Sequence, residues 1–224
     1  YPLRRQRQMC IRDRVWFFHQ LETPSDDKCH LKIFHFSHAG APRATPTTIP
    51  TTSPSPTPTP GGGTNTGFLN PSANAADSGG DRDGFEVNPA NAYTNGSGFA
   101  GNINGSGDRH RYHGYGINLP SNVTIEGIEV RLDWWLDTTQ RNASLCAQLS
   151  WDGGGSWSSL KCDVMRTTSE HTGILGGPKD KWGRTWIVDH LSDANFRVRI
   201  TANSSRADCD FYLDWVPVKV YYRQ

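Results

Sequence analysis

The chain has 224 residues, with 23 lysine plus arginine against 22 aspartate plus glutamate and a formal net charge of +1. This near-neutral balance gives no electrostatic basis for docking on the phosphates of a nucleic acid. No apolar run approaches the roughly 20 residues that a membrane-spanning helix needs, so the composition argues against a nucleic-acid-binding protein and a helical membrane protein.

Residues 1–44 show no sustained period of a helix or a strand. The first apolar burst, residues 15–18, follows five arginines without a small-residue cleavage site, so no signal peptide is recognised. The opening RRQRQMCIRDR resembles the translated sequencing-adapter tail that ends some metagenomic reading frames. We therefore expect residues 1–14 to be an artefact, residues 1–44 to be disordered or partly artefactual, and an upstream domain to be missing.

Residues 45–63 have the composition of a linker. The first sixteen are only threonine, proline, serine and one isoleucine, and three glycines follow. Such a segment cannot bury enough apolar surface to offset the entropy of ordering, and its prolines favour extended polyproline II. The sequence predicts a disordered, semi-rigid linker between the missing domain and residues 64–224.

Residues 64–224 are long enough for a single core and carry 15 basic and 18 acidic residues, a net of −3. The period of 2 is clearest in residues 128–136, where Trp134 shares the alternation of Ile128, Val130 and Leu132. Trp135 falls on the opposite face with charged residues. The pattern predicts a half-buried strand with Trp134 in the core.

Residues 143–162 read as a hairpin that turns at residues 152–155, with Trp157 beginning the return strand. If the turn is symmetric about Gly154, Cys146 and Cys162 lie directly opposite each other. Cysteines that face each other in a non-hydrogen-bonded pair can form a disulfide in an oxidising compartment. Cys209 would then lie outside this disulfide.

Two further alternating segments, residues 195–202 and 210–223, complete the predicted strands. Pro217 in the second favours an edge position or a bulge, because proline donates no ladder hydrogen bond. Short strands separated by Gly, Asn and Asp predict an all-β fold, an antiparallel sandwich or barrel.

Three segments, residues 116–137, 167–200 and 210–222, resemble a module that recurs in bacterial secreted, cell-surface and phage-associated proteins. Residues 88–101 are similar to its opening, so the resemblance covers residues 70–223. It implies a jelly-roll or galactose-binding-like β-sandwich and an extracellular or cell-surface location. It brings no catalytic residues with it.

Candidate ligand-binding residues follow from the chemistry of sugars, whose C–H faces stack on aromatic rings while their hydroxyls bond polar groups. The aromatic candidates have acidic and basic neighbours in the sequence, and together these are Trp135, Trp157, Tyr212, Asp133 and Arg131, with Asp152 and Asp214 nearby. Trp182 and Trp186 can either anchor a long loop or line a ligand face. The alternative is that all the tryptophans are ordinary core and edge residues.

A Gly-rich loop offers Asp77, Asp81 and Asp83 as oxygen ligands for a structural calcium ion, although their spacing differs from an EF-hand. No other cofactor is indicated. His110 and His113, three residues apart in extended chain, point to opposite faces, which disfavours a zinc site.

No catalytic motif is present, and an acid pair such as Asp210 and Asp214 indicates a glycosidase only when its separation is known. The sequence therefore favours a non-catalytic module of an exported multidomain bacterial protein that binds a polysaccharide or cell-surface glycan. The alternative is a structural or display module of a cell-surface or phage assembly without a small-molecule ligand.

Overall fold

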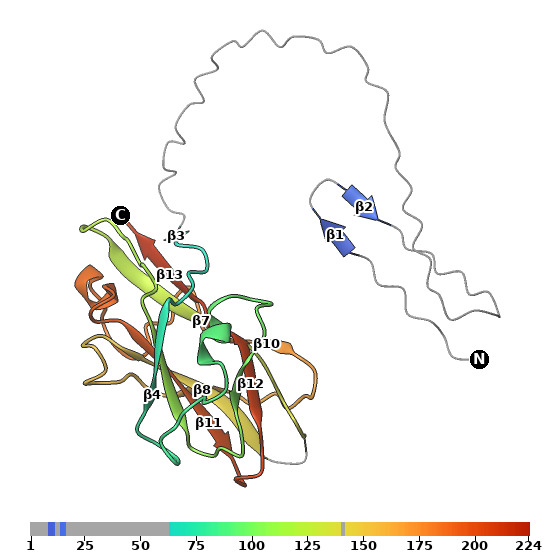
Figure 1. Cartoon of the computed structure of the whole chain (residues 1–224). Coiled ribbons are helices and arrows are strands. Elements are labelled where there is room, and N and C mark those ends of the chain that lie inside the picture. The colour runs from blue at the N-terminus through green and yellow to red at the C-terminus, as the bar shows by residue number, and fades with distance from the viewer. Residues whose placement is uncertain (1–8, 12–13, 17–62, 140–141) are drawn as a thin grey trace, which may run out of the picture. The chain divides into compact units, whose positions relative to one another are not determined.

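The structure is a computed structural model that describes residues 9–11, 14–16, 63–139 and 142–224 (Figure 1). The expectations for the linker and for most of residues 1–44 lie outside the described residues. The chain divides into two compact units, residues 1–55 and residues 56–224. In the first unit, β1 (Met9–Ile11) and β2 (Arg14–Trp16) form an antiparallel pair.

The second unit is an all-β sandwich of two antiparallel sheets, as the sequence predicts (Figure 1). One sheet has β7 at its centre and consists of β3 (Thr64–Asn65), β13 (Val218–Arg223), β7 (Thr124–Leu136), β12 (Phe211–Trp215), β5 (Ala100–Asn102) and β10 (His171–Gly176). The other sheet follows the order β4 (Ala73–Asp77), β6 (Arg109–His113), β11 (Arg197–Ser204), β8 (Ala143–Ser150) and β9 (Lys161–Asp163). The helices that the structure describes in this unit are two short 3₁₀ turns, η1 (Pro89–Tyr93) and η2 (Val188–Leu191).

The core forms because alternate residues of each strand point between the sheets. On β7 the inward set is Ile128, Val130, Leu132, Trp134 and Leu136, each at most 1% exposed. Trp134 stacks on Phe211 of the neighbouring β12, with 6.2 Å between ring centroids. The indole Nε1 of Trp134 also donates to Asp163 Oδ2 at 2.9 Å, so the predicted core position of Trp134 is confirmed.

β12 and β13 pair with successive parts of β7, and Pro217 lies between them. The pairing of β12 with β7 shifts register between Leu213 and Trp215. The Pro217 carbonyl accepts a hydrogen bond from the Arg131 amide at 3.1 Å. The register shift therefore lies three residues before the proline and not at it. Pro217 itself falls in the gap between β12 and β13, where its missing donor interrupts neither strand.

The β8–β9 hairpin has the register expected from symmetry about Gly154. Cys146 lies opposite Cys162, with 4.0 Å between Cα atoms, and their sulfurs form a disulfide. Cys209 is outside this disulfide and buried. The return strand begins at Lys161 and not at Trp157 as predicted, because Ser158 turns back onto Leu149 through hydrogen bonds at its amide and hydroxyl.

The long loop after β10 is anchored by two tryptophans. Trp182 and Trp186 are 1% and 4% exposed, and Trp182 Nε1 donates to the Ile128 carbonyl at 2.9 Å. A Cβ on Gly127 of β7 would come within 2.2 Å of the Gly177 carbonyl oxygen, so this close approach of loop and strand requires glycine. Both tryptophans are therefore architectural.

Candidate functional site

An aromatic cluster of Phe99, Trp135 and Tyr212 lies on the outer face of the β7 sheet. Trp135 and Tyr212 are opposite each other in register, and their rings are 5.5 Å apart and inclined at 40°. Phe99 packs edge-on against both rings, at 5.5 Å from Trp135 and 4.9 Å from Tyr212. Phe99 is 38% exposed, and the other two rings are half-buried. This cluster presents aromatic surface to solvent outside the core.

The loop between η1 and β5 carries Phe99 onto the sheet and is held by two buried carboxylates. Asn95 Nδ2 donates to Asp133 Oδ2 at 3.0 Å, and the Gly96 amide donates to both oxygens of Asp214 at 3.2 and 2.9 Å. Asp133 is fully buried and Asp214 is 3% exposed. These two acids therefore fix the loop.

The carboxylate of Asp133 accepts hydrogen bonds from several side chains. Arg131 contacts both of its oxygens, with Nε at 2.9 Å from Oδ1 and Nη2 at 2.8 Å from Oδ2. The Thr172 hydroxyl donates to Oδ1 at 2.6 Å. Asn95 Nδ2 also donates to Oδ2, so both carboxylate oxygens of Asp133 are occupied by protein donors. Asp133 is therefore not placed to bond a ligand hydroxyl. Arg131 also lies over the Trp215 ring, 4.8 Å from its centroid, as a cation–π contact.

The polar group that borders the aromatic cluster is Asp210. The Tyr212 hydroxyl donates to Asp210 Oδ2 at 3.3 Å, and the Asn104 amide donates to Oδ1 at 2.7 Å. Burial and the Asp210 charge raise the pKa of Tyr212, so its hydroxyl keeps its proton at neutral pH. The cluster therefore has a hydrogen-bonding rim on one side.

Trp157 does not lie with the cluster. It lies against the other sheet of the sandwich, where the Arg199 guanidinium carbon is 4.0 Å from its ring centroid. Asp152 is bound within its own turn, since its Oδ1 accepts from the Ser150 hydroxyl and the Ser156 amide. Of the seven residues that the sequence singled out, the structure brings Trp135 and Tyr212 together and places Arg131, Asp133 and Asp214 on the same sheet.

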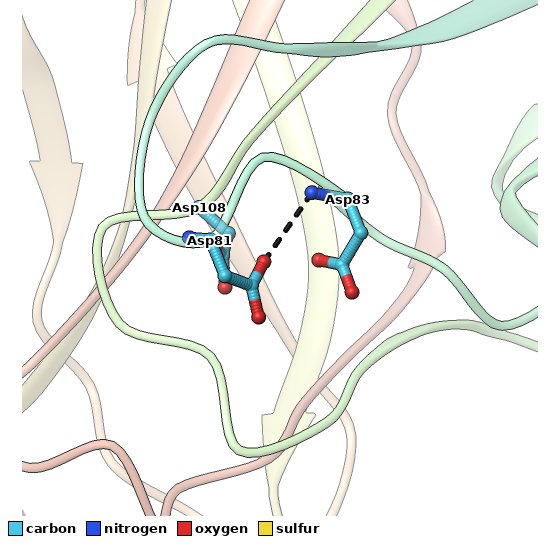
Figure 2. Close-up of side chains that lie close together, drawn as sticks. All are labelled: Asp81, Asp83 and Asp108. Carbon is cyan, nitrogen blue, oxygen red and sulfur yellow. Dashed lines mark hydrogen bonds between the residues drawn. The ribbon is translucent and has the colours of Figure 1, made fainter.

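An acidic group lies in the loops that follow β4 and precede β6, where Asp81, Asp83 and Asp108 each have an oxygen within 4.8 Å of the others (Figure 2). Asp83 N donates to Asp81 Oδ1 at 3.3 Å. The Asp81 carboxylate beside it, together with burial and Glu86, raises the pKa of Asp83 to about 6. The structure places Asp108, which the sequence analysis missed, beside the two predicted aspartates.

Asp77 points elsewhere. It is the last residue of β4, and its Oδ2 lies 3.5 Å from Arg199 and 3.8 Å from Arg111. Asp108 is 1% exposed and accepts from the Asp81 amide at 2.9 Å and from Asn102 Nδ2 at 3.0 Å. Asn102 Oδ1 is buried without a donor. A carboxylate oxygen set of this kind suits a hard cation such as calcium.

His110 and His113 lie on opposite faces of β6, as expected, and form no common site. His110 is 3% exposed, its Nδ1 accepts from the Phe85 amide at 3.1 Å, and its Nε2 lies 2.9 Å from Asn74 Oδ1. These contacts fix a neutral ring with the proton on Nε2. Burial and the Arg111 charge lower its pKa to about 4.

No protein-family model matches the chain, and no curated protein sequence is significantly similar to it. The helices in the described part of the chain are too short to cross a membrane. A shallow hollow of about 330 Å³ opens beside Ala143 and Val164, apart from the aromatic cluster.

Proposed function

We propose that residues 64–224 form a non-catalytic carbohydrate-binding module of an exported multidomain bacterial protein. The observation that carries this proposal is the solvent-exposed aromatic cluster of Phe99, Trp135 and Tyr212 outside the core. Aromatic rings beside hydrogen-bonding groups are what a sugar needs, since the C–H faces stack while the hydroxyls bond. Asp210 and the Tyr212 hydroxyl supply the polar groups.

The inclination of the rings limits the type of glycan. Trp135 and Tyr212 are inclined at 40°, and Phe99 stands at 77° and 65° to them. Rings that are not coplanar do not form a platform for a flat crystalline surface. We expect instead a ligand that is a single chain, in which one or two sugar rings contact the cluster.

Export is supported by two features. The Cys146–Cys162 disulfide is a bond that persists in oxidising compartments. The composition of residues 45–63 suits a spacer between independently folded domains. We therefore place the protein outside the cell or at its surface.

We include a structural calcium ion in this proposal, held by Asp81, Asp83 and Asp108. Three carboxylates this close repel one another, and a divalent cation would relieve the repulsion. Adding calcium to chelator-treated protein should raise the melting temperature at pH 7. No rise on calcium addition would exclude the ion.

The second candidate is a structural or display module without a small-molecule ligand. It is favoured by the burial of Trp134, Trp182 and Trp186, which serve the core and a crossing loop. It is also favoured by the full occupation of Asp133 within the protein.

Binding of the full chain to a panel of neutral soluble polysaccharides in native affinity gels tests the proposal. Trp135→Ala should abolish retardation on the polysaccharide that the wild type binds. Trp157→Ala is the matched control, because it removes a half-buried tryptophan from the other sheet, and it should bind as the wild type does. If the wild type binds no member of the panel, or both variants bind equally, the structural-module alternative is preferred.

A further inference from the structure

The outer face of the five-stranded sheet carries a row of arginines from two adjacent strands. Arg109 and Arg111 lie on β6, and Arg197 and Arg199 lie on β11. Arg199 is directly opposite Arg111 in register. Outward residues follow one another at about 6.8 Å along a strand and at about 4.8 Å between strands. We call these four residues the arginine face.

This arrangement of positive charges is costly unless carboxylates neutralise it. Like charges directly opposite each other in a sheet destabilise it. Burial and the charge of Arg109 lower the pKa of Arg199, and burial and the charge of Arg111 lower that of Arg197. The unit as a whole has a net charge of −3, so the positive charge is local to this face.

Few carboxylates neutralise it. Among the described residues, Asp77 forms the ion pairs of the arginine face, at 3.8 Å from Arg111 and 3.5 Å from Arg199. Asp193 lies at its edge and partly offsets the effect of burial and Arg111 on the pKa of Arg197. Two carboxylates thus accompany four guanidinium groups.

The guanidinium groups are held in place by acceptors within the protein, including the Asp193, Ala194 and Phe196 carbonyls that accept from Arg197. Arg109 Nη1 donates to the Ser78 carbonyl at 3.2 Å, and Arg199 Nη2 donates to Gln148 Oε1 at 2.7 Å. The Nε atoms of Arg109 and Arg199 are buried and have no acceptor. The Trp157 ring supports the Arg199 guanidinium at 4.0 Å. Groups fixed in advance lose less entropy when a ligand binds.

We propose that the arginine face binds a carboxylate-bearing polysaccharide. The guanidinium fork matches a carboxylate and forms paired, charge-assisted hydrogen bonds with it. An extended chain suits a row of cations on a sheet surface better than a compact ligand does. A nucleic acid is disfavoured because its charge recurs every ~1.7 Å and would meet the acidic remainder of the unit.

This face is independent of the aromatic cluster, because the two lie on different sheets. Trp157 also acquires a role here, as the support of Arg199. A neutral glycan would use the aromatic cluster, and an acidic glycan would use the arginine face. A negative result for one proposal therefore leaves the other unaffected.

The test is titration calorimetry of the full chain with polygalacturonate, and with its methyl ester, which has the same backbone without the charge. The wild type should bind the acid, and binding should weaken between about 50 and about 300 mM NaCl because exposed charges are screened. Arg111→Gln and Arg199→Gln should each weaken binding by about tenfold. Arg223→Gln on the other sheet should leave it unchanged, since Arg223 pairs with Glu126 there.

Arg111→Lys and Arg199→Lys keep the positive charge and serve if a glutamine variant does not fold. They lose the fork geometry and should weaken binding by about threefold to tenfold. Equal binding of the acid and its ester, or wild-type affinity in the double Lys variant, would overturn the proposal. It would also be overturned if single-stranded DNA bound as tightly as polygalacturonate.

Discussion

Trp134 and Trp135 are adjacent in the sequence and have opposite surroundings. Trp134 is fully buried between Phe211 and His171 and donates to Asp163. Trp135 is half-buried against Tyr212 and Phe99 on the outer face. The strand period of 2 is enough to predict this difference, because neighbouring side chains of a strand must point to opposite faces.

Trp134→Ala should therefore cost about 3–5 kcal/mol of unfolding free energy, through the lost apolar burial and the cavity left behind. Trp135→Ala should cost under about 1 kcal/mol because its ring keeps contact with solvent. Urea denaturation of both variants and the wild type measures the difference. A large loss in Trp135→Ala would mean that this residue supports the fold.

His110 gives the unfolding free energy a dependence on pH. Its pKa is about 4 in the folded protein, against 6.5 in the unfolded chain, because burial and Arg111 disfavour the charged ring. The unfolded chain takes up the proton first as the pH falls, so stability is lost between about pH 6.5 and pH 4. The loss amounts to roughly 3 kcal/mol when complete. Protonation would also abolish the hydrogen bond that Nδ1 accepts from Phe85.

Urea midpoints at several pH values check this prediction. The wild type should lose stability below about pH 6.5, and His110→Gln, which does not titrate, should show a smaller slope across the same range. His113→Gln, from the outer face of the same strand, is the comparison: burial also lowers the pKa of this half-buried histidine, so the variant should change the slope less than His110→Gln does. An identical slope in the wild type and His110→Gln would show that another group is responsible.

At the scale of elements, the loop between η1 and β5 decides whether the aromatic cluster exists. Its Gly96 amide is bonded by the buried Asp214 carboxylate, which belongs to a strand more than a hundred residues later in the chain. Strand alternation predicts the outward positions of Trp135 and Tyr212. It does not predict Phe99, because the position of this ring depends on hydrogen bonds between distant segments.

Asp214→Ala should release this loop, since the Gly96 amide then lacks its acceptor. Phe99 would leave Trp135, and we expect a red shift of tryptophan emission and a weaker near-ultraviolet dichroism signal. Removing a buried charged acceptor typically costs about 1–3 kcal/mol of unfolding free energy. Asp214→Asn keeps an oxygen for Gly96 and should retain most of both signals. Unchanged spectra in Asp214→Ala would show that the loop is fixed by other contacts.

The acidic loop shows a similar limit of sequence reasoning. The sequence offers Asp81 and Asp83 as two ligands of one calcium site, and the structure brings their carboxylates together. Asp77 was grouped with them, but it is the last residue of β4 and faces Arg111 and Arg199. Asp108 replaces it, because the loop before β6 returns to the end of β4, a contact that only the pairing of these strands creates.

At the scale of the whole molecule, the arginine face cannot be recognised from the net charge of the folded unit. A net of −3 over residues 64–224 gives no sign of a positively charged face. Arg111 and Arg199 are far apart in the sequence, and the pairing of β6 with β11 brings them opposite each other. The all-β fold followed from local alternation, whereas the distribution of charge over the two faces required knowledge of which strands are neighbours.

The boundary of the folded unit follows from where its core residues lie. The core residues of the sandwich run from Phe85 to Val220, and the buried Pro71 precedes them. Deletion of residues 1–62 should therefore leave the cooperative melt and the near-ultraviolet signal unchanged. Deletion of residues 1–72 is the matched comparison, because it removes β3 together with the hydrogen bonds of Thr66 to Val220 and of Leu69 to Val218. It should lower the melting temperature by several degrees, as a loss of about 1–2 kcal/mol predicts for a domain of this size. A broad, non-cooperative transition after the shorter deletion would show that residues before Gly63 belong to the folded unit.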